Sequence, residues 1–550
     1  MKFWIIASSI WLYYALARQR SADLWFTTGL LGWIGAGISL FFLLGHDWGV
    51  HPVRIELINR ICVWWMGLRP AIAIPMLDSN QVGGILALLL PFSILYGYTA
   101  LRGGEARRLD WATILIALTP VVLMTAGLIM SGERGAWFAL IAAVVIWWVE
   151  RTLRVARPIF DLTLVVMSIV ALLLISALIV YIAFNYYWEI ARLADQLLGS
   201  PNAESRFSLF ENTANLIGDF TLSGGGLTSF SGLYSQYVMV LPSFFLGYSH
   251  NLFLDVTLEQ GFFGLLALLS ILCGSAWLLG QSHKNGEIDS KISWLQQTIR
   301  ISLGIMVLHG LFDDALYGVG GAPLLLLVPG MSVAIHGAQF ERPEGGTNSG
   351  TGVGTRASGS GFSYLLPLLL LAIAGGVFLT RRDLRAAWLA NLGAVQMAQA
   401  QLADYPTREW ESSTDVTSLE APRKLFTRAL SYDAADPTAN HRLGLIAMVE
   451  RDYPVAVTYL ETALANDKNN RGIIKNLGYS YTWTGDYGRA LVLLEQIPEA
   501  ERELKIYTWW WHSQGNDDLA LKAQKMSEIL EAKQSFAFSY WYSSSMWVLN

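Results

Sequence analysis

The chain has 550 residues, of which 53% are hydrophobic and only 15% are charged. Soluble domains carry about 25% charged residues, so this composition argues against an ordinary soluble globular protein. The formal net charge is −5, which leaves no basic face of the kind that nucleic-acid binding requires. The two cysteines, Cys62 and Cys273, lie among apolar residues and can form neither a disulfide framework nor a zinc site.

Apolar stretches long enough to cross a bilayer dominate the first 380 residues. A bilayer core of about 30 Å needs roughly 20 apolar residues in a helix. The sequence predicts about ten spans, at 3–16, 24–44, 82–101, 111–130, 136–149, 159–184, 252–280, 299–316, 323–335 and 362–380. We therefore expect an all-α protein, a polytopic bundle of transmembrane helices.

Short loops rich in Lys and Arg tend to stay in the cytoplasm, and three such loops alternate along the predicted spans. They contain Arg102, Arg107 and Arg108, then Arg151, Arg154 and Arg157, then Lys284 and Lys291. With these loops inside, the turn at 131–135 and the segment at 185–249 lie outside. The outer segment is far longer than a connection needs, so we expect it to fold over the membrane surface as a functional element.

The chain changes character after the ninth predicted span. Residues 341–361 are rich in Gly, Ser and Thr and predict a flexible linker before the last span at 362–380. Further on, positions recur 34 residues apart, which is the tetratricopeptide period. The recurring pairs are Leu443 and Leu477, Gly444 and Gly478, Tyr453 and Tyr487, Ala456 and Ala490, and Leu460 and Leu494. We expect a membrane domain at 1–340 and a soluble tetratricopeptide repeat domain at 385–550.

Two arginines of the predicted outer segments are candidates for anion binding. Arg134 lies in the turn SGERGAW, where the sidedness rule disfavours a basic residue. Arg206 lies near the start of an amphipathic stretch, AESRFSLFENT, which the flexible-looking run 223–226 follows. A guanidinium is permanently charged and grips phosphate oxygens through two parallel hydrogen bonds. The alternatives are snorkelling to lipid headgroups for Arg134 and a solvated surface charge for Arg206.

Histidines near the ends of two spans are candidates for acid-base chemistry or substrate binding. His250 closes the outer segment, and histidine side chains ordinarily titrate close enough to neutral pH to accept a proton from a hydroxyl nucleophile. His309 and Asp313 are four residues apart and share one face of a predicted helix. An interfacial polar residue is the alternative for His250, and a mutually satisfied structural pair is the alternative for His309 and Asp313.

Taken together, these motifs resemble the O-antigen ligase and O-antigen polymerase (Wzy-type) superfamily. The resemblance rests on Arg134 in its short outer turn, Arg206 in a long outer loop, and the pair His250 and Asn251 that opens the next helix. It extends to LEQGFFGLL after the histidine, to HGLFDD further on, and to DSNQVGG, where Asn80 opens a span. The pattern departs from the family in having about ten spans instead of about twelve, and in its repeat domain.

The resemblance implies a glycosyltransferase of a bacterial inner membrane with its active site facing the periplasm. Its donor would be a glycan on undecaprenyl pyrophosphate, and its acceptor a hydroxyl of a glycan, lipid or protein. Arg134 and Arg206 would stabilise the departing pyrophosphate, and His250 would orient or deprotonate the acceptor hydroxyl, with inversion at the anomeric carbon. Asn251, Asp313, His309 and Asn80 would bind substrate. We expect neither a metal nor a cofactor.

The alternative function is that of a non-enzymatic transporter or flippase for a lipid-linked glycan, with a scaffolding repeat domain. Transporters tend to show matching halves with charges near the midplane, and neither feature is seen in this sequence. The repeat domain predicts a protein or peptide partner, besides membrane lipids around the bundle. The sequence does not distinguish ligase, polymerase and protein O-glycosyltransferase, nor does it indicate the glycan, the acceptor or the oligomeric state.

Overall fold

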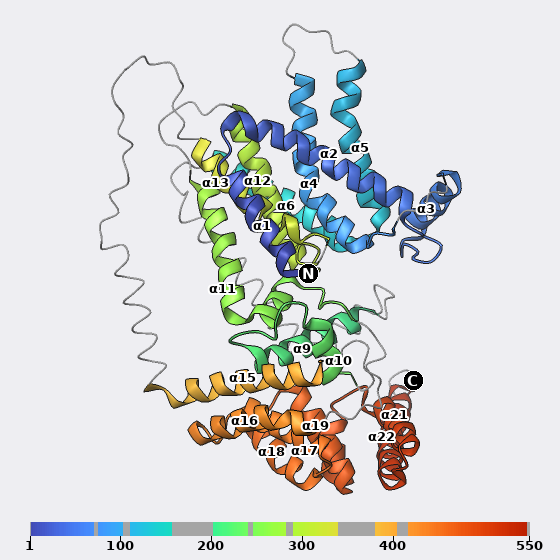
Figure 1. Cartoon of the computed structure of the whole chain (residues 1–550). Helices are drawn as coiled ribbons and strands as arrows, with labels where there is room; N and C mark the ends of the chain where they lie inside the picture. Colours follow the sequence, from blue (N-terminus) through green and yellow to red (C-terminus); the bar gives the residue numbers. More distant parts are fainter. Residues whose placement is uncertain are drawn as a thin grey trace. The chain divides into compact units, whose positions relative to one another are not determined.

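A computed structural model describes residues 2–70, 75–102, 111–156, 202–239, 246–281, 290–318, 320–338, 380–403 and 416–546 (Figure 1). Within these ranges the chain forms helices and no strands, which confirms the predicted all-α class. The predicted linker at 341–361, the span at 159–184 and nearly all of the span at 362–380 lie outside the described residues. The side chains of Arg107, Arg108, Arg154, Arg157 and Lys284 lie outside them as well.

The chain divides into two compact units. The first comprises Met1–Leu209, Tyr248–Val256 and Gly264–Gly346, and the second comprises Phe210–Gly247, Thr257–Phe263 and Thr347–Asn550. Part of the predicted outer segment therefore groups with the C-terminal helices, together with residues 257–263 of the helix that follows it. The domain ranges drawn from the sequence stay a prediction.

The first unit is a bundle around one central helix, α4 (Ser79–Arg102). Its other elements are α1 (Lys2–Ala17), α2 (Ser21–Gly45), α3 (Glu56–Leu68), α5 (Trp111–Ser131), α6 (Arg134–Ala156), α12 (Ser290–Gly310), η1 (Ala322–Leu324), α13 (Leu327–Ala338) and most of α11 (Leu252–Gly280). Helix α4 packs against α2, α5, α6 and α12. Small residues let these helices approach closely, since a Cβ on Gly97 would lie 2.8 Å from the carbonyl oxygen of Ala117.

Five of the described helices are long and apolar enough to cross a membrane: α2, α4, α5, α6 and α11. Large apolar side chains stand on their outer surfaces, with exposed fractions of 75% for Phe26, 62% for Val122, 63% for Ile141 and 66% for Trp277. Exposing this much apolar surface to water is energetically unfavourable, whereas contact with lipid tails removes that penalty. The structure thus fits a multi-pass membrane protein, while the number of spans stays a prediction.

Two predicted spans have different boundaries in the structure. The span predicted at 299–316 is helix α12, which runs from Ser290 to Gly310, and the backbone amides of Phe312 and Asp313 both donate to the His309 carbonyl at its end. The span predicted at 323–335 is divided into η1 and α13. In addition, α3 is a short helix that the sequence did not predict.

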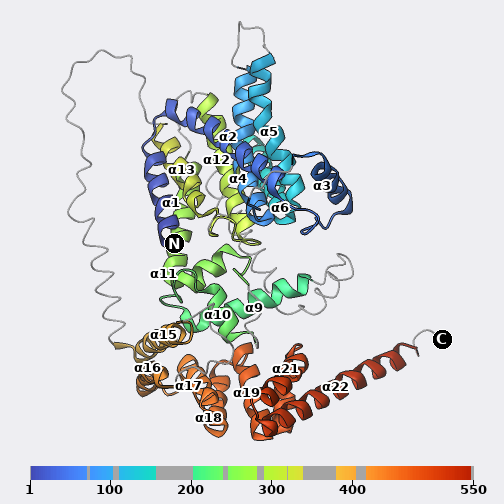
Figure 2. The ribbon, with the colours of Figure 1, turned by 45° about the vertical axis from the view of Figure 1, so that its right-hand side comes forward.

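The second unit contains the C-terminal helices, which pair in chain order. They are α15 (Arg382–Gln401), η2 (Val416–Leu419), α16 (Glu420–Tyr432), α17 (Pro437–Val449), α18 (Tyr453–Asn466), α19 (Arg471–Thr484), α20 (Tyr487–Leu494), α21 (Ala500–Ser513) and α22 (Asp517–Met546). Both views show them stacked from α15 to α22, orange to red (Figure 1, Figure 2).

Helix starts in this unit recur with the predicted spacing. Asp436 and Asn470 cap α17 and α19, and Asp452 and Asp486 cap α18 and α20, each side chain accepting a backbone N–H three residues on. A Cβ on Gly444 would lie 2.6 Å from Leu460, and the same relation joins Gly478 to Leu494. The helices thus repeat as hairpins, and their assignment as tetratricopeptide repeats stays a prediction.

Two further helices of the outer segment, α9 (Asn202–Phe220) and α10 (Phe230–Tyr237), are joined by the glycine run that the sequence suggested to be flexible. This run is a packed turn. The amides of Gly225 and Gly226 donate to the carbonyls of Leu258 and Glu259, at 2.7 and 3.0 Å, where α11 is broken at Gly261. The glycines are therefore needed for close backbone approach.

Candidate active site

A cavity of about 480 Å³ opens in the first unit, among the predicted outer ends of its helices. The loop between α2 and α3, the start of α4, the turn between α5 and α6, and one side chain of α9 form its wall. The lining residues are His46, Val50, His51, Pro52, Val53, Arg54, Ser79, Asn80, Ser131, Gly132, Glu133, Arg134, Gly135 and Arg206. Three of the predicted site residues, Asn80, Arg134 and Arg206, therefore line one cavity.

The turn that carries Arg134 is shaped by its neighbours. Helix α5 ends at Ser131, Gly132 adopts a φ of +65°, and α6 begins at Arg134 itself. The Glu133 carboxylate accepts the amide of Gly135 at 3.0 Å and is 6% exposed. Arg134 is exposed and stands on the first turn of α6, where unpaired amides already favour an anion.

Glu133 is a charged wall residue that the sequence analysis did not single out. Burial raises its pKa, the nearby Asp313 carboxylate raises it further, and Arg206 and His250 oppose this rise. Its Cβ also lies against α4, where a Cβ on Gly83 would be 2.6 Å away, which explains the first glycine of the QVGG motif. Glu133 thus links the arginines electrostatically to the second group of site residues, around His250.

Arg206 reaches that second group directly. Its Nη1 donates to the backbone carbonyl of Phe312 at 3.4 Å, one residue before Asp313. The side chain is only partly buried, so most of its donors stay available to the cavity. Because α9 supplies this arginine and the loop after α12 supplies its acceptor, residues 106 positions apart meet here.

Arg54 is a third cation at the cavity, which sequence reasoning missed. Its pKa is lowered by burial and, next, by the positive charges of Arg134 and Arg206, with Glu133 acting in the opposite direction. The sidedness argument that singled out Arg134 could have found it. Residues 46–78 precede a predicted span whose far end carries the predicted cytoplasmic Arg102, so the same rule predicts Arg54 on the outer side.

His250 is held in an unusual backbone conformation next to a buried carboxylate. Its φ is +59°, a left-handed value that non-glycine residues adopt mainly at turns and functional sites. Its Nδ1 lies 3.1 Å from Oδ2 of Asp313, whose side chain is fully buried, whereas the His250 side chain is 22% exposed. With Nδ1–H donated to the carboxylate, Nε2 is the nitrogen that accepts a proton.

Asn251 sets this geometry from the next position. Its Oδ1 accepts the amides of Phe253 and Leu254 at 3.0 and 3.1 Å and caps α11, while its Nδ2 donates to the Leu311 carbonyl at 3.1 Å. The cap therefore ties the start of α11 to the loop after α12 that carries Asp313. The substrate-binding role predicted for Asn251 stays a prediction, beside this structural one.

Tyr248 joins the His250 group to the cavity wall. Its ring meets the His250 imidazole edge to face, with centroids 4.5 Å apart, and its hydroxyl shares a hydrogen bond with the Asn80 side chain. Burial, together with the charges of Asp313 and Asp78, raises the pKa of Tyr248 above the usual range. Asn80 is thereby connected to His250 through one aromatic residue.

His309 lies apart from the cavity. It is 3% exposed and packs against α4, where its imidazole occupies the space that a side chain at Gly84 would need. The Asp313 carboxylate meets His250, and Asp313 is bonded to His309 through the backbone. The expected shared helix face is absent because α12 ends at Gly310, so a substrate-binding role for His309 stays a prediction without cavity contact.

Across the described ranges, no cluster of three or more His, Cys, Asp or Glu side chains is arranged to hold a metal ion. The cavity instead offers three guanidinium groups and a helix start, which are donors for an oxyanion. Next to it, Nδ1 of His250 lies against the buried Asp313 carboxylate, a pairing that is chemically able to serve as a base with an orienting carboxylate. This arrangement is suited to binding an anionic leaving group and to taking up one proton.

A comparison with protein families gives a match, which covers part of the chain. Residues 119–269 match the family model described as O-antigen ligase, and the match includes Arg134, Arg206 and His250. A comparison with curated proteins finds no match to the chain. Residues 119–269 are thus similar to the O-antigen ligase family, which supports the resemblance to the O-antigen ligase and polymerase superfamily that the motifs indicated.

Proposed function

We propose that this protein transfers a glycan from an undecaprenyl-pyrophosphate-type carrier to an acceptor hydroxyl, as an O-antigen ligase or a polysaccharide polymerase would. The observation that carries the proposal is the cavity where Arg54, Arg134 and Arg206 meet. Three like charges repel one another, and a bound dianion relieves that repulsion. A pyrophosphate at the end of a lipid tail supplies such a dianion at the membrane surface.

The cavity suits the leaving group better than the sugar. In the transfer, the acceptor oxygen attacks the anomeric carbon, the bond from that carbon to the pyrophosphate oxygen breaks, and the electron pair leaves with the pyrophosphate. Negative charge then grows on the leaving group. Guanidinium donors that are already in place stabilise this charge with little reorganisation. Stabilisation of developing charge by preorganised donors is often the largest contribution to catalysis.

His250 is placed to receive the acceptor proton. Since its Nδ1–H is held by Asp313, the free Nε2 takes the proton from the hydroxyl as the new bond forms. Direct displacement of this kind inverts the anomeric centre. The proton afterwards returns to solvent, because the His250 side chain is partly exposed. In this scheme the arginines neutralise the leaving group, so transfer needs no metal.

The proposal also includes a location. The carrier headgroup of such a donor stands on the periplasmic side of a bacterial inner membrane, and the positive-inside rule predicts the cavity on that side. Exposed apolar surfaces on the candidate spans are consistent with a multi-pass protein in that membrane. The glycan could pass to a glycan, a lipid or a protein hydroxyl.

The test is transfer by the purified full chain in detergent, with a lipid-pyrophosphate-linked oligosaccharide and separate glycan, lipid and peptide acceptors, in the presence of EDTA. Wild type should transfer, and Arg134→Ala and His250→Ala should each lower kcat/KM by on the order of 100-fold or more. Thermal unfolding of each variant should match wild type, so that loss of folding is separated from loss of chemistry.

Other outcomes contradict the proposal. If transfer requires a divalent cation, the claim that the reaction needs no metal is wrong. If the product retains the anomeric configuration of the donor, the mechanism is not a direct displacement. If no acceptor is glycosylated while vesicles containing the protein move the lipid-linked glycan across the bilayer, the protein is a transporter.

A further inference from the structure

One face of the C-terminal hairpins is already occupied by another part of the same unit. This face is formed by the first helices of the successive pairs, α15, α17, α19 and α21, and we call it the first-helix face. Residues 210–239, which include α10 and the second half of α9, lie on it, and Figures 1 and 2 both show α10 beside these helices. We call residues 210–239 the docked segment.

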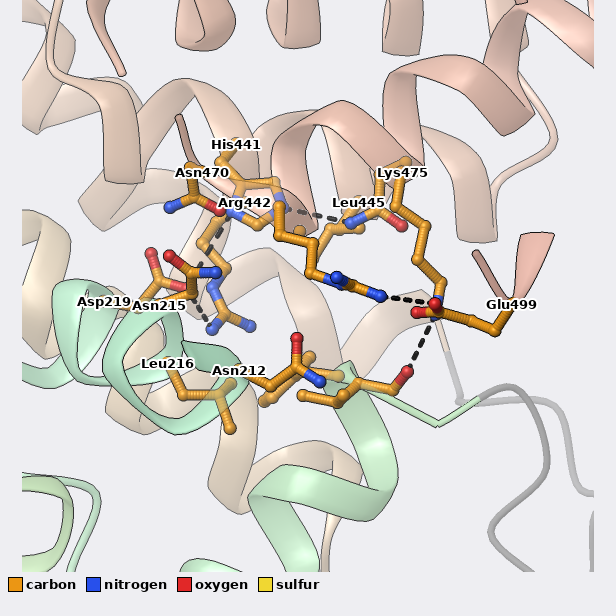
Figure 3. Close-up of a pocket in the computed structure, with 15 residues that line it drawn as sticks. Asn212, Asn215, Leu216, Asp219, His441, Arg442, Leu445, Asn470, Lys475 and Glu499 are labelled. Atoms are coloured by element: carbon orange, nitrogen blue, oxygen red, sulfur yellow. Dashed lines mark hydrogen bonds and ion pairs between the residues drawn. The ribbon is translucent and has the colours of Figure 1, made fainter. Parts of the chain in front are cut away.

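A buried ion pair lies at the centre of this contact. Nη2 of Arg442 on α17 lies 2.6 Å from Oδ2 of Asp219 on α9, with the Arg442 side chain fully buried and Asp219 7% exposed (Figure 3). The guanidinium also stacks on Tyr237 of α10, with 3.9 Å to the ring centroid, and lies near Phe220. A buried cation is strongly unfavourable without its counter-ion, so Arg442 requires the docked segment.

Polar contacts on both sides of this pair fix the register. On α15, Oδ1 of Asn391 accepts the amides of Leu222 and Ser223 at 3.1 and 2.9 Å. On α19, Nζ of Lys475 donates to the carbonyl of Val238 at 3.0 Å. These partners are backbone groups of the docked segment, which a loosely bound surface loop would leave to water.

The contact leaves little room for anything else. The cavity lined by Asp219, Arg442, Asn470 and their neighbours has a volume of about 40 Å³, enough for one or two water molecules (Figure 3). A Cβ on Gly232 would lie 2.9 Å from Leu402, so α10 packs tightly against the end of α15. An external peptide would have to displace the docked segment before it could use this face.

The docked segment is continuous with a site residue. Helix α9 runs from Asn202 to Phe220 and carries both Arg206 and Asp219, 13 residues apart, or roughly 20 Å along the helix axis. Whatever holds Asp219 therefore also limits the motion of the helix that carries Arg206. Loss of that restraint lowers the fraction of time for which the guanidinium is in place.

We propose that the C-terminal hairpins bind this chain's own docked segment, residues 210–239, and that Asp219 and Arg442 are positioning residues for Arg206. The second half of this inference rests on the proposed function, and the first half does not. The unit then serves the transfer reaction from within the chain, instead of recruiting a separate partner through this face.

Hydrogen exchange on the purified full chain tests the docking without any substrate. Arg442→Ala should raise amide exchange at least tenfold in 210–220 and 230–237, with α18 and α20 unchanged. Asp219→Asn should raise exchange in the same residues. This variant keeps the side-chain shape and lies outside the hairpins, so it replaces Arg442→Ala if that variant fails to fold. The matched control is Arg489→Ala, which removes an exposed arginine of α20 that pairs with Asp486 and Glu461. Unchanged exchange in 210–237 for both test variants would overturn the docking.

A double-mutant cycle tests the positioning role. Arg442→Ala should lower transfer kcat/KM about tenfold in the wild-type chain and have no further effect in the Arg206→Ala chain, because it acts through Arg206. A merely structural role would lower the remaining activity of Arg206→Ala by the same factor, which contradicts the proposal. If wild type shows no transfer at all, the proposed function fails, while hydrogen exchange still decides the docking.

Discussion

Nδ1 of His250 lies 3.1 Å from Oδ2 of Asp313, across 63 positions of the chain. The contact joins the turn before α11 to the turn after α12, and Asn251 fastens the same two turns through its hydrogen bond to Leu311. The histidine and the carboxylate that we propose as base and orienting group are thus brought together at the ends of two helices. Helix ends are the natural place for such groups, because the backbone there is free to turn the side chains inward.

Asp313→Asn should lower kcat for transfer by roughly 10–100-fold while the donor KM changes little. The amide can no longer fix the Nδ1–H tautomer of His250, but it leaves the arginine cavity intact. Steady-state kinetics with varied donor would separate the two constants. The matched control is Glu56→Gln, which removes an exposed carboxylate of α3 that pairs with Arg60. It should leave kcat and the donor KM unchanged. Full activity of Asp313→Asn would remove it from the site.

Arg54→Ala should weaken donor binding and slow transfer, lowering kcat/KM on the order of tenfold to 100-fold. The reason is that Arg54 adds a third positive charge to the cavity that Arg134 and Arg206 share. Arg60→Ala is the matched control, since Arg60 is exposed on α3 and its partner is Glu56. Equal activities of the two variants would show that Arg54 does not contact the donor.

The sequence predicted the local features well, because charged residues that interrupt apolar runs are visible in one dimension. The turn around Arg134, the helix that opens at Asn251 and the 34-residue recurrence of Tyr453 and Tyr487 could be predicted, because each shows in a short stretch of sequence. Arg54 was open to the same reasoning. It was missed because the loop around it carries no recurring pattern.

Contacts between distant segments were not predictable in the same way. Asp219 and Arg442 are 223 residues apart, and neither lies in a sequence motif from which its partner could be predicted. The glycine run was also misinterpreted, because glycine is common both in flexible linkers and where two backbones pack closely. The run at 223–226 suggested a loose linker, whereas it packs on the break in α11, and only the contacts distinguish these cases.

Gly261→Ala should destabilise the protein by roughly 2–4 kcal/mol. Gly261 has φ +70° and ψ −170°, a region open essentially to glycine alone, and its Cβ would meet the carbonyl oxygen of Leu222. Gly274→Ala on the same helix is the matched control, because its Cβ would meet nothing within 4 Å. Thermal unfolding in detergent should show a lower midpoint for Gly261→Ala alone. Equal midpoints would mean that the break in α11 is dispensable.

The stability of the C-terminal unit should fall as the pH drops below 6.5, through His441. Burial, the largest cause, lowers the pKa of His441 to about 4, with Asp219 and Asp467 opposing this and Arg442 adding to it. Asn476 donates to its Nε2 at 3.1 Å, so the folded state holds the neutral ring. As the pH falls, the unfolded chain takes up the proton first, near pH 6.5, and the folded chain only near pH 4.

Stability is therefore complete above pH 6.5, declines below it and levels off near pH 4, with a loss of roughly 2 kcal/mol at pH 5. The measurement is thermal unfolding at pH 7.5 and pH 5, followed in the transition that Arg442→Ala also shifts. His441→Gln keeps an acceptor for Asn476 but does not titrate, so the difference between the two chains isolates this histidine from the carboxylates. Parallel shifts of wild type and His441→Gln would show that another group causes the pH dependence.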